Sequence, residues 1–342
     1  MRHDHDRFTN RQITLDHDDD TGLGGELGAY VAELLGDTWA PEPADLPRDG
    51  SRLAVTSSSC TIDPPFFGDG DIGRVAACRA INDLAAAGAE PAWLTLGLTI
   101  EAGLPGSLLR RAVESARDAA REAGVRIVDV EARVVRAGEA NRLFVHTTGF
   151  GVRLGPAQRM SDARPGDLVL LTSRLGGYAV HLLSVRQDLG LENVVPSGCA
   201  PLAELLASAR AAAPPGAVRF VHRLARGGLA GALQAQASAS RLTVRVVEAW
   251  IPVQHEIGAA AELLGLDPLY ATDEGCLCLC VAADAAEDVL AALRSNRYGR
   301  YAQVVGEVTG IGSPAVVVAG ADGQVRSTDV RAALWAEPPR LR

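Results

Sequence analysis

Strand-like and helix-like segments alternate along almost the whole chain, and a break near residues 155–167 divides this alternation into two halves of similar size. The break has the sequence LGPAQRMSDARPGD, whose glycines and prolines interrupt regular structure. A length of 342 residues also exceeds that of one average domain. We therefore predict an α+β fold with two domains, residues 21–157 and 158–330. A flexible acidic segment, 1–20, precedes them, and a tail, 331–342, follows.

The first half is predicted to be β-rich, with its helices lying between strands. Helices are expected near 25–36, 71–88 and 107–124, and strands near 52–57, 92–99, 125–135 and 142–152. Asp71 is placed to cap the second of these helices, and Gly88 to end it. The segment TIDPPFFGDG between the first strand and this helix is predicted to lack regular structure because of its prolines and glycines.

The second half begins with a predicted strand, LVLLTS, and a glycine turn at Gly176 and Gly177. Helices are then expected near 178–188, 201–212, 226–239, 255–265 and 286–295, and further strands at LTVRVVEAW and around CLCLC, before a terminal hairpin that turns at Asp322 and Gly323. The alternating CLCLC favours a core strand over a thiolate metal site, because thiolate sites in proteins usually have CxxC spacing.

The charge composition excludes several kinds of chemistry. All 33 basic residues are arginine, so the chain has no lysine for a Schiff base, for self-adenylylation or for a Walker A loop. A net charge of −9 argues against nonspecific nucleic-acid binding. No apolar run is long enough to span a membrane, and the first twenty residues lack an apolar signal region, so a cytoplasmic location is expected.

One long motif, FFGDGDIGRVAACRAINDLAAAGAEPAWLTLGLTIEAG, resembles the HypE family of hydrogenase-maturation proteins, within the aminoimidazole-ribotide synthetase (PurM-like) superfamily. In the second half, SDARPGDLVLLTS, RGGLAGAL, IPVQHEIGAAAELLGLDPLY and DEG follow the order and spacing of the same family. The resemblance extends from about residue 13 to the end of the chain.

The resemblance implies two α+β domains, a homodimer formed by the N-terminal sheets, and ATP with Mg²⁺ bound between domains and subunits. It also implies an activity. The family receives a carbamoyl group on a C-terminal cysteine and uses ATP to dehydrate it to a thiocyanate, the source of cyanide for nickel–iron hydrogenase. A carbamoyltransferase and other hydrogenase-maturation proteins are the implied partners.

Several positions depart from the family pattern. Ser58 stands where the family has a metal-binding aspartate, and Glu131 stands where it has the aspartate of Gly-Asp-Thr. Gly176–Ala179 reads GGYA in place of Gly-Asp-His-Gly, and Arg223 replaces the aspartate of Asp-Pro-Thr. Arg342 replaces the acceptor cysteine of the family's tail motif, and a guanidinium is no nucleophile.

Five polar residues are the candidates for metal binding, catalysis and the surroundings of ATP. Glu131 and Asp83 are predicted Mg²⁺ ligands, and Glu131 and Glu274 are predicted catalytic residues. Asp71, Asn82 and Asp83 are predicted to lie around the cofactor. Structural roles compete for these residues: a helix cap for Asp71, an exposed strand face for Glu131 and a surface turn for Glu274.

The phosphates of ATP are predicted to meet glycine-rich backbone. Arg226, Gly227 and Gly228 open a predicted helix, where free backbone N–H groups and a cation suit an anion, although a tight strand-to-helix turn requires the same glycines. Gly24 and Gly25 match the family's N-terminal glycine-rich loop.

Two functions remain open on this sequence. The first is a HypE-like protein that is catalytically impaired and acts through protein partners. The second is an active ATP-dependent enzyme that phosphorylates and dehydrates an amide or carbamoyl group on a substrate supplied in trans.

Overall fold

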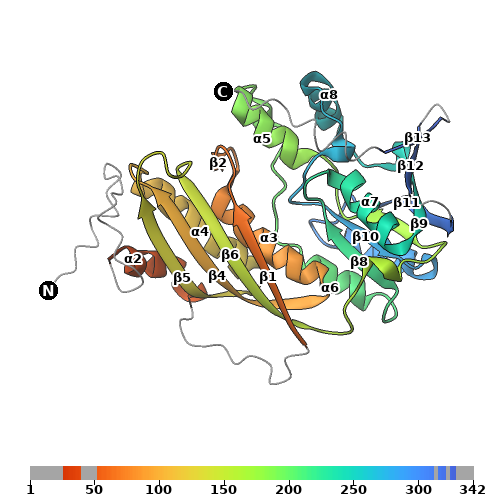
Figure 1. Ribbon diagram of the computed structural model, residues 1–342, viewed down its shortest axis with the longest axis horizontal. Coiled ribbons are helices and arrows are strands. Elements are labelled where there is room, and N and C mark those ends of the chain that lie inside the picture. Colours follow the sequence, from red (N-terminus) through yellow and green to blue (C-terminus); the bar gives the residue numbers. More distant parts are fainter. Residues whose placement is uncertain (1–25, 40–51, 312–314, 321–323, 329–342) are drawn as a thin grey trace. The chain divides into compact units, whose positions relative to one another are not determined.

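The computed structural model describes residues 26–39, 52–311, 315–320 and 324–328, which form two compact units (Figure 1). The N-terminal unit comprises the described residues up to Ala85, together with Ala89–Gly155 and Cys199–Ala203. The C-terminal unit comprises Ala86–Gly88, Pro156–Gly198 and the described residues from Glu204 onwards. Along the chain, the main change from one unit to the other therefore falls between Gly155 and Pro156.

The N-terminal unit is a four-stranded sheet with three helices. Its strands lie in the order β1-β6-β4-β5. The strands are β1 (Leu53–Cys60), β4 (Ala89–Glu101), β5 (Arg126–Val135) and β6 (Leu143–Arg153), and the helices are α2 (Glu26–Leu35), α3 (Ile72–Ala86) and α4 (Gly106–Glu122). The predicted helices and strands of this half are thus confirmed, with shifted ends. The segment TIDPPFFGDG differs from the prediction, because β2 (Phe66–Phe67) and β3 (Gly70–Asp71) pair as a small antiparallel hairpin.

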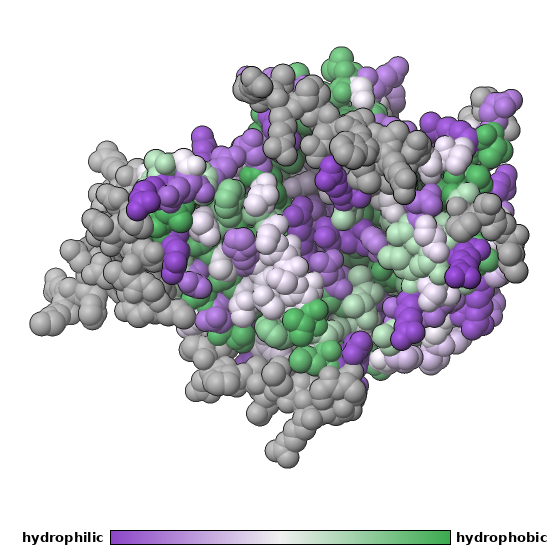
Figure 2. Space-filling view, in the orientation of Figure 1, coloured by the Kyte–Doolittle hydropathy of each residue, from purple (hydrophilic) through white to green (hydrophobic). Residues whose placement is uncertain are grey.

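Helices α3 and α4 cover one face of this sheet. Thr147 on β6 donates a hydrogen bond to the Ala76 carbonyl of α3, and α3 and α4 approach so closely that a Cβ on Gly73 would lie 1.9 Å from the Ala112 carbonyl oxygen. The opposite face is rich in serine and threonine, and Figure 2 shows pale colours, near the middle of the hydropathy scale, over β1 and β6. The sheet thus has one helix-covered face and one open face, on which the serines and threonines lie beside the half-buried aromatic residues Trp93, Phe144 and Phe150.

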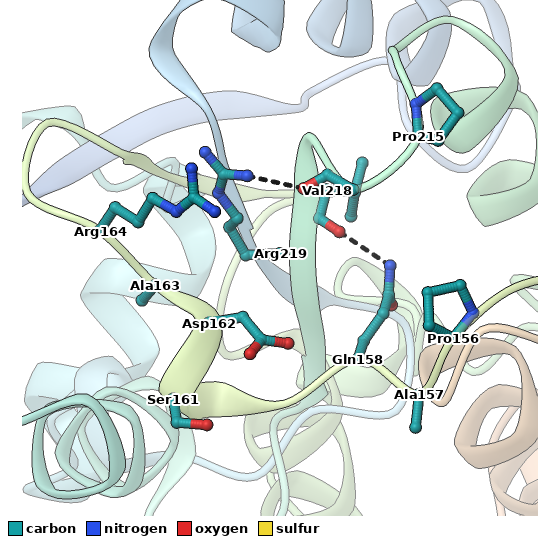
Figure 3. Close-up of a pocket in the computed structure, with 11 residues that line it drawn as sticks. Pro156, Ala157, Gln158, Ser161, Asp162, Ala163, Arg164, Pro215, Val218 and Arg219 are labelled. Atoms are coloured by element: carbon teal, nitrogen blue, oxygen red, sulfur yellow. Dashed lines mark hydrogen bonds between the residues drawn. The ribbon is translucent and has the colours of Figure 1, made fainter.

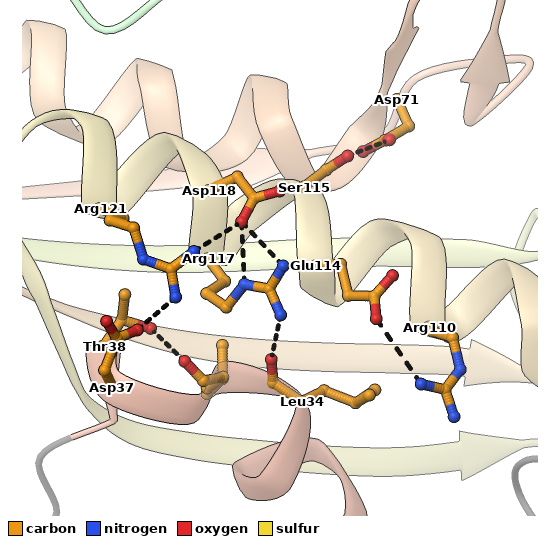
Figure 4. A network of polar contacts seen from close by, with 11 residues as sticks. Leu34, Asp37, Thr38, Asp71, Arg110, Glu114, Ser115, Arg117, Asp118 and Arg121 are labelled. Atoms are coloured by element: carbon orange, nitrogen blue, oxygen red, sulfur yellow. Dashed lines mark hydrogen bonds and ion pairs between the residues drawn. The ribbon is translucent and has the colours of Figure 1, made fainter.

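An arginine network fastens the beginning of the described chain to α4 (Figure 4). Arg117 donates to the Leu34 carbonyl at 3.0 Å, Arg121 forms an ion pair with Asp37, and both arginines contact Asp118. Helix α2 also packs against β5, the edge strand. These contacts fix the helix that immediately follows Gly25.

The C-terminal unit is a seven-stranded mixed sheet with five helices and has the strand order β13-β12-β9-β11-β7-β10-β8. Its strands are β7 (Leu168–Leu171), β8 (Val218–Arg223), β9 (Leu242–Val247), β10 (Leu277–Val281), β11 (Gln303–Ile311), β12 (Ala315–Ala319) and β13 (Val325–Ser327). Its α-helices are α5 (Gly177–Gln187), α6 (Ala203–Ala211), α7 (Gly228–Ser240), α8 (His255–Leu264) and α9 (Ala286–Ser295). Strands β8 and β11 were not predicted. The antiparallel pairing of β12 with β13 agrees with the predicted terminal hairpin, whose turn lies outside the described residues.

The CLCLC segment is a core strand, as predicted. All residues of β10, which lies between β7 and β8 in the sheet, are buried on both faces. Burial raises the pKa of the Cys276, Cys278 and Cys280 thiols well above the ordinary value. No described helix is both long and apolar enough to cross a membrane.

All six cysteines are free and buried. We therefore expect the native protein to react with a colorimetric thiol reagent only as slowly as it opens, and all six thiols to react rapidly in denaturant, because a reagent needs an accessible thiolate. Counting the thiols that react with and without guanidinium chloride tests this. One thiol that reacts rapidly in the native state would contradict it.

Candidate functional site

Three connections of the C-terminal unit meet at one edge of its sheet. β10 runs antiparallel to β7 and β8, and the registers place Cys278 opposite Leu171, and Leu277 opposite Arg223. The residues that follow β7, those that follow β8 and those that precede β10 therefore lie side by side. These are the segments 172–178, 224–228 and 270–276, which carry most of the motif positions of the second half.

Asp273 holds these connections together. Its carboxylate accepts hydrogen bonds from the backbone N–H of Gly176 at 3.1 Å and of Gly275 at 2.9 Å, and its own N–H donates to the Leu224 carbonyl. Burial raises the pKa of Asp273 to about 7, and the nearby Glu274 carboxylate adds to this, against the lowering effect of the backbone hydrogen bonds. A buried carboxyl that titrates near neutral pH is typical of functional sites, although structural networks also produce it.

Glu274 is buried beside an arginine. Its carboxylate lies 3.6 Å from the Arg223 guanidinium, and the two side chains are 0% and 18% exposed. The turn therefore does not lie at the surface, in contrast to the structural alternative drawn from the sequence. Because Arg223 ends β8 and Glu274 precedes β10, the ion pair spans two neighbouring strands.

The glycines at the start of α7 have a clear conformational reason. Gly227 and Gly228 adopt φ values of +87° and +57°, which favour glycine. A Cβ on Gly228 would also lie 2.6 Å from the Ala271 carbonyl oxygen. Arg226 is exposed just before this helix. The predicted tight turn is confirmed. The Gly228 N–H donates to the Ala225 carbonyl at 2.9 Å, so the N–H groups of the first turn that remain suited to an anion are those of Leu229 and Ala230.

Asp71 caps α3, as predicted. One carboxylate oxygen accepts the backbone N–H groups of Gly73 at 2.9 Å and Arg74 at 3.1 Å, and the other accepts the Ser115 hydroxyl (Figure 4). The Arg111 guanidinium lies 3.5 Å from the same carboxylate. Burial raises the pKa of Asp71 despite these contacts. A role of Asp71 toward a cofactor stays a prediction.

Asn82 binds a distant part of the chain. Its amide nitrogen donates to the Ala200 carbonyl at 3.0 Å, and its amide oxygen accepts the Leu202 N–H at 2.7 Å. Arg74, near the start of the same helix, donates to the Cys199 carbonyl. Both polar atoms of the Asn82 side chain thus bind the segment 199–203. Its neighbour Asp83 is partly buried on the same helix.

Glu131 lies on the open face of the N-terminal sheet. It is 64% exposed, pairs with Arg133 at 3.6 Å, and stands opposite Gly97 on β4. Helix α3, which carries Asp83, packs on the other face, so the structure does not bring the two predicted metal ligands together within the N-terminal unit. Over the described ranges, no group of three or more His, Cys, Asp or Glu side chains could hold a metal ion.

Two residues shape the site without having been predicted. Asp273 stands in the sequence only as part of the DEG motif, with no predicted role, and Arg223 stands only where the family has an aspartate. The DEG motif indicates two adjacent acidic residues at a turn. The strand VRFVHR, which brings Arg223 next to them, is not among the predicted strands. Gly24 and Gly25 lie outside the described residues.

Comparisons with known proteins agree on one family. Sequence profiles of the AIR synthase related protein match residues 42–153 (N-terminal domain) and 164–319 (C-terminal domain). Carbamoyl dehydratase HypE of Cupriavidus necator is 41% identical over 84% of this chain and 84% of its own. A crystal structure of HypE in complex with ATP superposes with a TM-score of 0.84 at 33% identity, covering 92% and 97% of the two chains. A HypE–HypF complex gives a TM-score of 0.77 at 33% identity, over 81% and 90%.

Proposed function

Because this chain belongs to the HypE family of hydrogenase-maturation proteins, we propose that it serves that maturation by binding other maturation proteins, and that it does not carry out ATP-driven dehydration of a carbamoyl group. The observation that carries the proposal is the Arg223–Glu274 ion pair at the sheet edge of the C-terminal unit. It is joined there by the buried Asp273.

The residues at this edge do not fit Mg²⁺. The ion is held by one or two carboxylates with phosphate oxygens and water. A guanidinium beside a carboxylate repels a second cation and weakens its binding there. Here the buried Glu274 carboxylate already faces a guanidinium, and Asp273 is engaged by two backbone N–H groups. The predicted ligands Asp83 and Glu131 lie on different faces of the N-terminal sheet. We derive no catalytic step through the metal.

The anion-binding part of the site is better preserved. The first turn of α7 offers backbone N–H groups next to the exposed Arg226, a combination that suits a phosphate group. A related HypE has been solved with ATP bound. We propose that this chain binds nucleotide at the start of α7 without the help of magnesium.

The proposed partners follow from the family. A related HypE has been solved in complex with HypF. We propose that this chain binds a maturation protein of that kind, the carbamoyltransferase, and that it forms a homodimer. Size-exclusion chromatography with light scattering, alone and with the carbamoyltransferase, tests both associations.

Calorimetric titration with ATP, with and without Mg²⁺, tests the proposed loss of the metal. We expect magnesium to change the dissociation constant of the native protein by less than about threefold, which is less than 1 kcal/mol. In Arg223→Asp, which places the family's aspartate beside Glu274, magnesium should tighten ATP binding by about tenfold or more. The matched control is Arg245→Asp, which makes the same charge change at an exposed arginine paired with Glu307 on the surface.

The alternative function predicts a different result. The preserved start of α7 favours this alternative. An enzyme that phosphorylates a carbamoyl or amide group in trans would also need to bind phosphate there. Micromolar, magnesium-dependent ATP binding by the native protein would overturn the proposal. So would ATP consumption with carbamoyl phosphate and the carbamoyltransferase that Glu131→Ala abolishes.

A further inference from the structure

A polar pocket of about 590 Å³ opens in the C-terminal unit, away from the edge described above (Figure 3). Two segments line it. The first is 156–164, which follows the last strand of the N-terminal unit, and the second is 215–219, which leads into β8. The volume lies in the range of small-molecule sites.

The pocket and the candidate site lie at opposite ends of the same strands. Val218 and Arg219 line the pocket at the start of β8, whereas Arg223 at the end of β8 pairs with Glu274. Five residue steps along a strand span about 17 Å. Arg164 likewise precedes β7, and the turn bound by Asp273 follows β7. A ligand of the pocket therefore does not touch the proposed nucleotide site.

Arginine dominates the charge around the pocket. Arg219 donates two hydrogen bonds to the carboxylate of the buried Asp167, at 3.1 and 3.3 Å, and a third to the Gly216 carbonyl. No carboxylate among the described residues forms an ion pair with the side chain of Arg164, which is exposed at the pocket. In Figure 3 the guanidinium groups of Arg164 and Arg219 extend to the same end of the pocket.

A third arginine stands directly behind the lining. Arg210 donates to the side-chain oxygen of Gln158 at 3.0 Å and to the Ala86 carbonyl at 3.2 Å. Its Nε is buried and has no acceptor in the part of the chain that the structure describes. Burial lowers the pKa of Arg210 to about 10, so the group keeps its charge at neutral pH. Three guanidinium groups thus face two carboxylates, those of Asp162 and Asp167, and the balance favours an anion.

The rest of the lining supplies neutral hydrogen-bonding groups. Gln158 is fixed, because its amide nitrogen donates to the Val218 carbonyl at 2.8 Å while its oxygen accepts from Arg210. Ser161 and Asp162 also line the pocket, and Pro156 and Pro215 contribute apolar walls. This combination suits an organic molecule with one anionic end and a polar body.

We infer that this pocket binds a small organic anion, with a phosphate or carboxylate group at Arg164 and Arg219 and a hydrogen-bonding portion at Gln158 and Ser161. The site is separate from that of the proposed function and does not depend on it. The pocket end of β8 lies about 17 Å from Arg223 at the other end of the strand, so a ligand in the pocket would not contact the residues of the proposed function.

Calorimetry and thermal shift with two probes, phosphoserine and succinate, test the inference and separate the two anionic groups. We expect at least one probe to bind with a millimolar or lower dissociation constant. Arg164→Glu should weaken that binding by about tenfold or more, and Arg164→Met should weaken it less, because it removes a cation without adding a carboxylate. Circular dichroism checks that each variant is folded.

Two controls separate this pocket from the rest of the chain. Arg245→Glu makes the same charge reversal on the surface and should change probe binding by less than about twofold. Saturating ATP should leave probe binding unchanged, because the two sites lie apart. Absence of binding by both probes at millimolar concentration, an equal loss in the Arg245 variant, or displacement of the probe by ATP would each overturn the inference.

Discussion

Replacing Arg223 by leucine is expected to lower the free energy of unfolding by about 3 kcal/mol. The substitution leaves the fully buried Glu274 carboxylate without its cationic neighbour 3.6 Å away. A buried charge that loses its counter-ion is costly, whereas the same pair replaced by apolar side chains of similar volume is often neutral. Urea denaturation followed by circular dichroism measures the difference.

A double variant separates the charge effect from loss of packing. We expect Arg223→Leu together with Glu274→Leu to be more stable than Arg223→Leu alone. The surface pair of Arg245 and Glu307, with both side chains 47% exposed, provides the matched control, and Arg245→Leu should cost less than about 1 kcal/mol. If Arg223→Leu and Arg245→Leu lost the same stability, the buried pair would not have the role assigned to it.

Stability should fall as the pH rises from about 4 to about 7, and Asp273 should be a main cause. The pKa of its carboxyl is about 7 in the folded chain, compared with an ordinary value of 3.8. Between these values the folded state binds more protons than the unfolded state, so raising the pH favours unfolding, and above about pH 7 the effect levels off. A shift of about three pKa units corresponds to at most about 4 kcal/mol.

Asp273→Asn isolates this contribution, because asparagine does not titrate. The variant has a fixed cost, since one amide oxygen cannot replace two carboxylate oxygens that accept from Gly176 and Gly275. Its stability relative to the native protein should nevertheless rise between pH 5 and pH 8, by more than about 1 kcal/mol in urea titrations. Parallel stability curves for the two proteins would show that Asp273 does not titrate in this range.

Local patterns predicted those parts of the fold that depend on neighbouring residues. The cap of α3 by Asp71 and the burial of CLCLC both follow from residues close in sequence. A local pattern also indicates that Glu131 is exposed. Asp129, Glu131 and Arg133 alternate with buried residues, which places all three on the open face of β5. The exposed strand face, the structural alternative for Glu131, is therefore the one that the structure shows.

Other features depend on residues that are far apart in sequence. Nothing near Asn82 indicates that its amide binds residues 118 and 120 positions further on. The Arg223–Glu274 pair required knowing that VRFVHR is an edge strand beside β10, and this short strand was not recognised. Pairings of this kind are set by sheet topology, which a single sequence does not specify.

The five residues 199–203 make the N-terminal unit discontinuous in sequence. A gene fragment that stops at Gly155 would encode the whole four-stranded sheet, yet the amide of Asn82 and the guanidinium of Arg74 would lose the backbone groups that they bind. The N-terminal unit therefore does not end at Gly155, and a fragment designed to fold as this unit would have to include residues 199–203 as well.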